Sequence, residues 1–378
     1  MVCRSPCPAG RFGTVIERIR EALAQARATT DWSALGYVAT NGKDGDEVDG
    51  NQQPRALVLW GLQYDHGPAD LPLVRWLAEQ EAICRRESEG GLGNEAELAG
   101  YLLATYRQVE DVWRHWAIKR SNFDAGTAYD AEYLVAAGPA ETIAYVRGAD
   151  HPEQAELLEY LLENLADAEL TDWWGDKREW FPADPADEHQ LTWFDRARLL
   201  GDRDAAHAVL LRWADGRKRD EGTLSSMYYR LVDLGYHDEA ADAARARIAL
   251  LRDSPALDLT IAYSNLAEQE RAAGRYPAAL AALRAWATRD GADLGVSYVN
   301  ELFLLARDAD TDVAAAAFAE GDRVAPSVLS RLSFEVLDAA AETAATVGAH
   351  DRAAAYGSLR DAERTRIDAM LRRATTAP

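Results

Sequence analysis

Histidine, cysteine and acidic side chains are the groups of this chain that could carry acid–base, nucleophilic or metal chemistry. Asp65 with His66, and Asp187 and Glu188 with His189, have the composition of general acid–base groups. None of the seven histidines stands in an HExxH motif or at a paired helical spacing. The chain has no Gly-x-Ser-x-Gly motif and no cysteine beside a histidine. The sequence therefore predicts no catalytic residue, no metal and no cofactor, and an enzyme is kept only as an alternative.

Two glycine- or cysteine-containing patterns resemble ligand sites but lack the residues that would complete them. Cys3 and Cys7 have the spacing of half a metal site, yet no matching Cys/His pair stands nearby. The GGLG run at residues 90–93 precedes a helical segment, as phosphate loops do. It lacks the Lys-Ser/Thr ending and no strand leads into it, so a turn between two helices is predicted.

Residues 41–53 are rich in Gly and Asp and offer almost nothing to bury. A calcium loop counted from Asp44 would need oxygen ligands where Val48 and Arg55 stand. We therefore expect a mobile acidic loop here and no calcium site.

Aromatic side chains crowd residues 171–187, a segment that contains two prolines and is predicted to be a loop. Trp173, Trp174 and Trp180 form its aromatic seam. Aromatics on an irregular segment can make a binding platform, but large aromatics are usually buried and could equally fill the contact between the two halves of the chain. If the protein were an enzyme, this seam is where we would expect its pocket.

Charge limits the partners of the protein. The chain has 63 acidic and 41 basic residues, a formal net charge of −22. Such a field repels nucleic acid and anionic lipid and favours basic partners. No apolar run reaches the roughly 20 residues that span a bilayer, and three cysteines are too few for a disulfide framework. We expect a cytoplasmic protein; abundant Arg and Ala with only four lysines are typical of a GC-rich bacterial genome.

Apolar residues recur at helical spacing almost throughout, and no strand of convincing length is visible, so the chain is predicted to be all-α. The longest predicted helix covers residues 95–119. Composition changes near residue 180. We expect an N-terminal region, 1–180, of divergent helix pairs, followed by a regular array over residues 187–372.

The array is clearest in residues 259–286, which read as two short helices around a turn glycine. The stretch resembles a tetratricopeptide repeat (TPR), whose unit carries in order an aromatic, a Leu, a small residue, a turn Gly, a Tyr and an Ala, here Tyr263, Leu266, Ala267, Gly274, Tyr276 and Ala279. Similar units turn at Gly201, Gly235, Ala309 and Gly348, close to the reference period of about 34 residues. The resemblance implies an α-solenoid of antiparallel helix pairs; a generic Ala-rich helical bundle is the alternative.

By this resemblance, the first helix of each unit lines a concave groove that accepts an extended or helical peptide. The implied groove residues are Asp195, Arg198, Tyr229, Ser264, Asn265, Glu268, Arg271, Asn300 and Phe303. A family subtype that clamps a peptide carboxylate with Lys, Asn and Arg is matched only at Asn265, so that ligand is not predicted.

The sequence thus favours a scaffold or adaptor that binds a protein or peptide through this groove. The alternative is an acidic, immunity- or antitoxin-like protein that neutralises a basic effector through its negative field. The third interpretation is the enzyme with a pocket at the seam 171–187.

Overall fold

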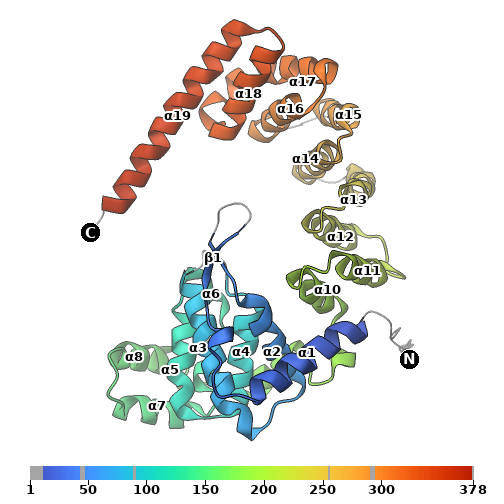
Figure 1. The fold of residues 1–378 in the computed structure, drawn as a ribbon. Coiled ribbons are helices and arrows are strands. Elements are labelled where there is room, and N and C mark those ends of the chain that lie inside the picture. The colour runs from blue at the N-terminus through green and yellow to red at the C-terminus, as the bar shows by residue number, and fades with distance from the viewer. Residues whose placement is uncertain (1–11, 43–46, 88–90, 254–255, 290–293, 377–378) are drawn as a thin grey trace. The chain divides into compact units, whose positions relative to one another are not determined.

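A computed structural model of the protein describes residues 12–42, 47–87, 91–253, 256–289 and 294–376 (Figure 1). Among these residues the regular structure consists of nineteen α-helices, short 3-10 helices and one two-stranded hairpin. The predicted all-α class is confirmed. Tertiary contacts divide the chain into two compact units, Met1–Ala205 and Ala206–Pro378. The division therefore falls after Ala205, and not near residue 180.

The first unit holds the ten helices α1 (Phe12–Arg27), α2 (Gln52–Tyr64), α3 (Leu71–Glu87), α4 (Asn94–Thr105), α5 (Val112–Lys119), α6 (Phe123–Ala128), α7 (Pro139–Gly148), α8 (Gln154–Asn164), α9 (Thr171–Trp180) and α10 (Gln190–Leu199). Helices α1 to α4 supply most of its main core. Val74, Leu77 and Ala78 of α3, which helical spacing places on one face, are fully buried in it.

A small hairpin corrects the prediction of a loop over residues 41–53. Strands β1 (Ala39–Asn41) and β2 (Glu47–Asp49) pair antiparallel, with Thr40 opposite Val48, and α2 follows almost at once. Asp49 is the reason: its buried carboxylate accepts hydrogen bonds from the Asn51 backbone N–H and from the Arg55 guanidinium. Residues 43–46, including Asp44, lie outside the described residues.

The predicted helix 95–119 is wrong as one element, because the chain turns between α4 and α5. Arg107 has φ +51°, and it is the one non-glycine residue in the described ranges with a positive φ. The Tyr106 hydroxyl donates to Gly67 O at 2.8 Å, and Asp111 of the connecting turn binds Arg75 of α3 at 2.7 Å. These contacts hold the connection on α3, although the apolar spacing of the sequence continues through it.

Gly100 in the middle of α4 is required by a close approach. A Cβ there would lie against the Tyr129 hydroxyl and 2.8 Å from a carbon of its ring. Alanine has the higher helix propensity, but the overlap outweighs it. We expect Gly100→Ala to lower the free energy of unfolding by about 1–3 kcal/mol, measured by urea denaturation.

Gly175 of α9 provides the matched control, since nothing lies within 4 Å of a Cβ added there. Gly175→Ala should raise the free energy of unfolding by about 0.5–1 kcal/mol through helix propensity alone. If both substitutions changed the free energy of unfolding in the same direction, the packing of Tyr129 on α4 would be contradicted.

The second unit continues from α11 (Arg203–Ala214), which starts just before the division, with α12 (Glu221–Asp233), α13 (His237–Leu250), α14 (Ala256–Ala272), α15 (Tyr276–Ala287), α16 (Val296–Asp308), α17 (Thr311–Val324), α18 (Phe334–Thr346) and α19 (His350–Thr376). From α12 onward each helix contacts the next along the chain, in the order that Figure 1 shows. Helix α16 also contacts α14 and α18 directly. The small residues Ala267 and Ala279 are buried where α14 meets α15.

Glycines end the helices at four of the five predicted turn positions. Gly201, Gly235, Gly274 and Gly348 all have φ between +70° and +79°, the left-handed conformation that glycine adopts without strain. The residue after each donates its N–H to a carbonyl of the last helical turn, at 2.7–2.9 Å. The fifth position, Ala309, works differently: α16 ends and the Asp310 side chain caps α17.

Candidate functional site

The predicted groove residues fall on four helices. Asp195 and Arg198 lie on α10 in the first unit; Tyr229 lies on α12, the four residues from Ser264 to Arg271 on α14, and Asn300 and Phe303 on α16. Since α14 contacts α16, the structure brings the residues of these two helices together.

Phe303 is corrected from a groove contact to a core residue. Its side chain is fully buried, and its ring packs 5.3 Å from Tyr356 of α19 and 6.0 Å from Phe318 of α17. The repeat pattern places position 303 on the first helix of its unit, but it cannot foresee that α19 closes over that ring.

Tyr229, by contrast, exposes half of its side chain and stands edge-on to Tyr228, with ring centroids 5.1 Å apart. Tyr228 is buried, and burial raises the pKa of its hydroxyl well above the usual value. A chain of polar contacts links Tyr228 to two neighbouring helices. Gln269 Nε2 donates to Tyr228 Oη at 3.3 Å, and Gln269 Oε1 lies 2.9 Å from His237 Nδ1. Gln269 was missed in the sequence because a buried glutamine has no signature of its own.

Asn265 is held in place by the neighbouring helix α13. With its amide oriented to satisfy its neighbours, Oδ1 accepts from Arg247 Nη1 at 3.2 Å and Nδ2 donates to Ile261 O at 3.3 Å. Arg247 also binds Glu221 of α12 at 2.8 Å. Asn265 thus connects α14 to α12 and α13 through one arginine, while Ser264 beside it is half-buried.

Arg271 joins α14 to α16 within a group of acidic side chains. Its Nη1 lies 2.6 Å from Asp308 Oδ2, and its Nε lies 3.7 Å from Glu301 Oε2. Burial raises the pKa of Glu301 to about 7, an effect that Arg271 opposes and that the carboxylates of Glu268 and Asp308 reinforce. Three carboxylates therefore lie around Arg271, and Arg307 Nε also binds one of them, Asp308 Oδ1, at 2.9 Å. Next to them, Asn300 Oδ1 is buried with no hydrogen-bond partner among the described residues.

The three tryptophans of the seam lie on a helix, which corrects the loop predicted over residues 171–187. The prolines at 182 and 185 follow α9 and do not interrupt it. Trp174 is buried, Trp173 donates its indole N–H to Asp130 at 2.8 Å, and Trp180 is 63% exposed. Trp173 and Trp174 pack within the core of the first unit.

Both sequence-derived acid–base pairs make structural contacts within the first unit. Glu188 is buried and accepts hydrogen bonds from Gln63 at 3.0 Å and Tyr64 at 2.7 Å, and Arg196 pairs with it at 3.1 Å. Asp65 pairs with Arg27 at 2.9 Å. The Glu188 contacts fix α10 on α2. His66 Nδ1 lies 2.9 Å from Leu62 O, and His189 Nδ1 accepts from the Leu191 N–H at 3.3 Å.

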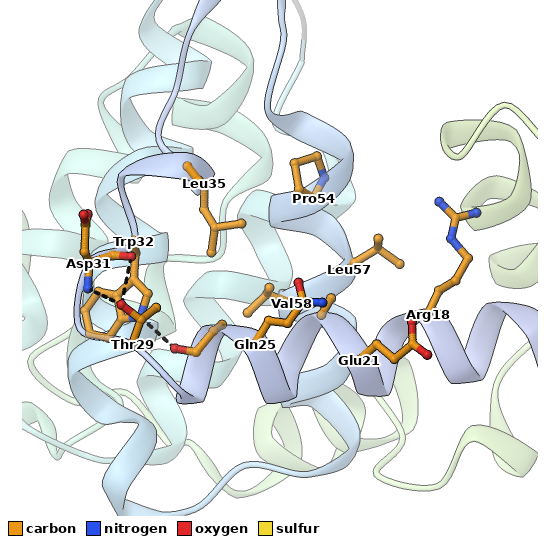
Figure 2. Close-up of a pocket in the computed structure, with 13 residues that line it drawn as sticks. Arg18, Glu21, Gln25, Thr29, Asp31, Trp32, Leu35, Pro54, Leu57 and Val58 are labelled. Atoms are coloured by element: carbon orange, nitrogen blue, oxygen red, sulfur yellow. Dashed lines mark hydrogen bonds between the residues drawn. The ribbon is translucent and has the colours of Figure 1, made fainter.

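An open pocket of about 340 Å³ lies where α1 meets α2. Figure 2 shows its apolar wall, formed by Leu35, Leu57 and Val58, and a rim on which Arg18 and Glu21 carry opposite charges. The Thr29 hydroxyl accepts a hydrogen bond from the Asp31 N–H at 3.0 Å, which shapes one end. The pocket suits an uncharged, largely apolar group.

No protein-family model, curated protein or solved structure matches the chain. Over the described ranges, no helix is long and apolar enough to cross a membrane. Within the same ranges, no three His, Cys, Asp or Glu side chains gather as metal ligands; Cys3 and Cys7 lie outside them.

Proposed function

We propose that the second unit is a TPR-like α-solenoid that binds another protein or peptide through the face shared by α12, α14 and α16. The observation that carries the proposal is the acidic group on α14 and α16, where Glu268, Glu301 and Asp308 surround Arg271. Helices α14 and α16 contact each other there, and α12 joins α14 through the Tyr228 hydroxyl, which donates to Asn265 O at 3.4 Å. We call these four residues, with the exposed Tyr229, the acidic face.

The chemistry of the acidic face indicates a basic ligand. Arg271 and Arg307 offer two guanidinium groups to three carboxylates, so a lysine or arginine side chain of a partner would gain charge-assisted hydrogen bonds on arrival. On α12, Tyr229 offers an exposed ring for apolar or cation–π contact. A peptide with spaced basic and apolar residues fits this combination.

The second candidate is the neutraliser of a basic effector, which the net charge of −22 favours. The two functions differ in how much of the binding free energy comes from long-range charge. A neutraliser would associate quickly and lose its partner steeply with salt, because the Debye length shortens. A groove binder would keep its partner at high salt.

Charge reversal on the acidic face tests the proposal. We expect Glu268→Arg and Tyr229→Ala each to weaken partner binding by about tenfold or more, whereas Asp368→Arg on exposed α19 leaves it unchanged. The measurement is affinity capture from native lysate with each variant, at 50 and 500 mM salt, followed by titration of the retained protein.

A partner that binds wild type and Glu268→Arg equally well would exclude the acidic face as its binding site. A partner that all variants retain at low salt and lose at high salt would support the neutraliser instead. Circular dichroism of each variant separates loss of binding from loss of folding.

A further inference from the structure

A second pocket, of about 290 Å³, opens in the first unit where α7 and α9 begin and α4 is connected to α5. Its lining includes Trp174 and two arginines, Arg107 from the α4–α5 connection and Arg178 from α9. Gly138 and Thr171, at the starts of the two helices, complete the polar part of its wall. The pocket is separate from the acidic face, which belongs to the second unit.

The two guanidinium groups lie over one indole ring and have no acidic partner. The guanidinium carbon of Arg107 is 5.2 Å, and that of Arg178 5.9 Å, from the ring centroid of Trp174. In the described part of the chain neither guanidinium forms an ion pair or a hydrogen bond. Both arginine side chains are exposed, so their donors can meet a ligand that arrives from solvent.

Several other arginines of this unit bind carboxylates. Arg75 and Arg114 share Asp111, and Arg27 pairs with Asp70. Guanidinium groups prefer such planar, bidentate contact with oxyanions. Arg107 and Arg178 therefore present unused donors at the mouth of a cavity.

The backbone at Arg107 adds an independent observation. Its φ of +51° is disfavoured for any residue with a Cβ, and glycine or asparagine would fill the position at lower cost. Strained non-glycine residues persist only where the surrounding structure holds them, and they cluster at active sites and ligand clamps. Here the strained residue supplies one of the two guanidinium groups over Trp174.

We propose that this pocket binds a small molecule that carries a phosphate or carboxylate group. Arg107 and Arg178 would hold the oxyanion, and the Thr171 hydroxyl at the pocket wall would donate a further hydrogen bond. The α9 N-cap residue, Leu170, makes no side-chain capping bond, which leaves the first N–H groups of that helix available to an anion as well. Ala136 and Leu170 give the rest of the ligand an apolar wall.

Thermal unfolding with defined anions tests the proposal. In metal-free buffer of constant ionic strength, wild type is titrated with pyrophosphate, with citrate and with chloride. We expect a saturable rise in Tm with pyrophosphate or citrate and none with chloride. A rise with pyrophosphate alone identifies a phosphate ligand, and a rise with citrate alone identifies a carboxylate ligand.

Variants separate a site from general anion effects. Arg178→Gln and Arg107→Gly should weaken the apparent affinity by about tenfold or more, whereas Arg20→Gln, an equal charge change on exposed α1, should leave it unchanged. Without anion, Arg107→Gly should not lower Tm, because glycine suits the left-handed backbone.

An equal response of wild type and Arg178→Gln, or no response of wild type to either polyanion, would overturn the proposal. The Tm of Glu268→Arg should respond to anions as that of wild type does. Partner capture thus tests the acidic face, and the anion response tests this pocket independently.

Discussion

Replacing Arg55 by methionine is expected to lower the free energy of unfolding by about 3–5 kcal/mol. The Arg55 side chain is fully buried, with Nη2 2.5 Å from Asp49 Oδ2 and Nε 2.6 Å from Glu81 Oε1. Both carboxylates are also buried, at 4% and 3% exposure. Methionine matches the volume but leaves two negative charges buried without a partner, which is the costly way to break such a group.

The pH dependence follows from Asp49. Burial alone would raise its pKa, but the hydrogen bonds from Arg55 and from the Asn51 N–H outweigh burial and hold the pKa below the usual 3.8. A lowered carboxylate pKa gives stability that is present above the unfolded value and lost as the pH falls through the folded value. The cost of Arg55→Met should therefore be largest near neutral pH and shrink below about pH 4.

Urea denaturation at pH 7 and pH 3 measures this, with Arg86→Met, on the exposed end of α3, as the control for loss of one positive charge. A cost below about 1 kcal/mol at pH 7 would mean that the hairpin carrying Asp49 does not close on α2 in solution.

Glu301→Gln is expected to have the opposite effect and to raise the free energy of unfolding by about 2–3 kcal/mol at pH 8. Burial raises the pKa of Glu301 to about 7 from 4.5, against the attraction of Arg271. A raised carboxyl pKa gives stability that is full below the unfolded value and lost as the pH rises through the folded value. At pH 5 the carboxyl is already neutral in the folded state, so the gain should be small there.

The control for this prediction is Glu342→Gln on the exposed side of α18. Denaturation at pH 5 and pH 8 should give no pH-dependent gain for the control. A gain of the same size at both pH values for Glu301→Gln would show that the carboxylate is solvated. If the gain appears together with weaker partner binding, the buried charge costs stability because the acidic face needs it.

The structural features that could be predicted from the sequence are those that depend on residues close together in the chain. The left-handed glycines at 201, 235, 274 and 348 follow from the chemistry of one residue, and the sequence located all four. Helix faces such as that of α3 follow from apolar spacing.

The features that escaped prediction are set by distant partners. Asp49 looked like part of a solvated loop because its burial depends on a group of three residues. Arg55 binds both Asp49 and Glu81, and Glu81 lies 26 residues beyond Arg55 in the sequence. Arg107 breaks a helix without any breaker residue, since the packing of Tyr106 and Asp111 overrides local preference. Phe303 is buried by α19, whose approach no local pattern encodes.

The succession of contacts from α12 to α19 has a consequence for how such a chain changes over generations. Each of these helices contacts helices one or two places away along the chain, so no set of residues in the middle must fit every other part at once. Duplicating or deleting one hairpin would create a single new junction and leave the others intact. The number of hairpins could then change over generations without redesign of a shared centre.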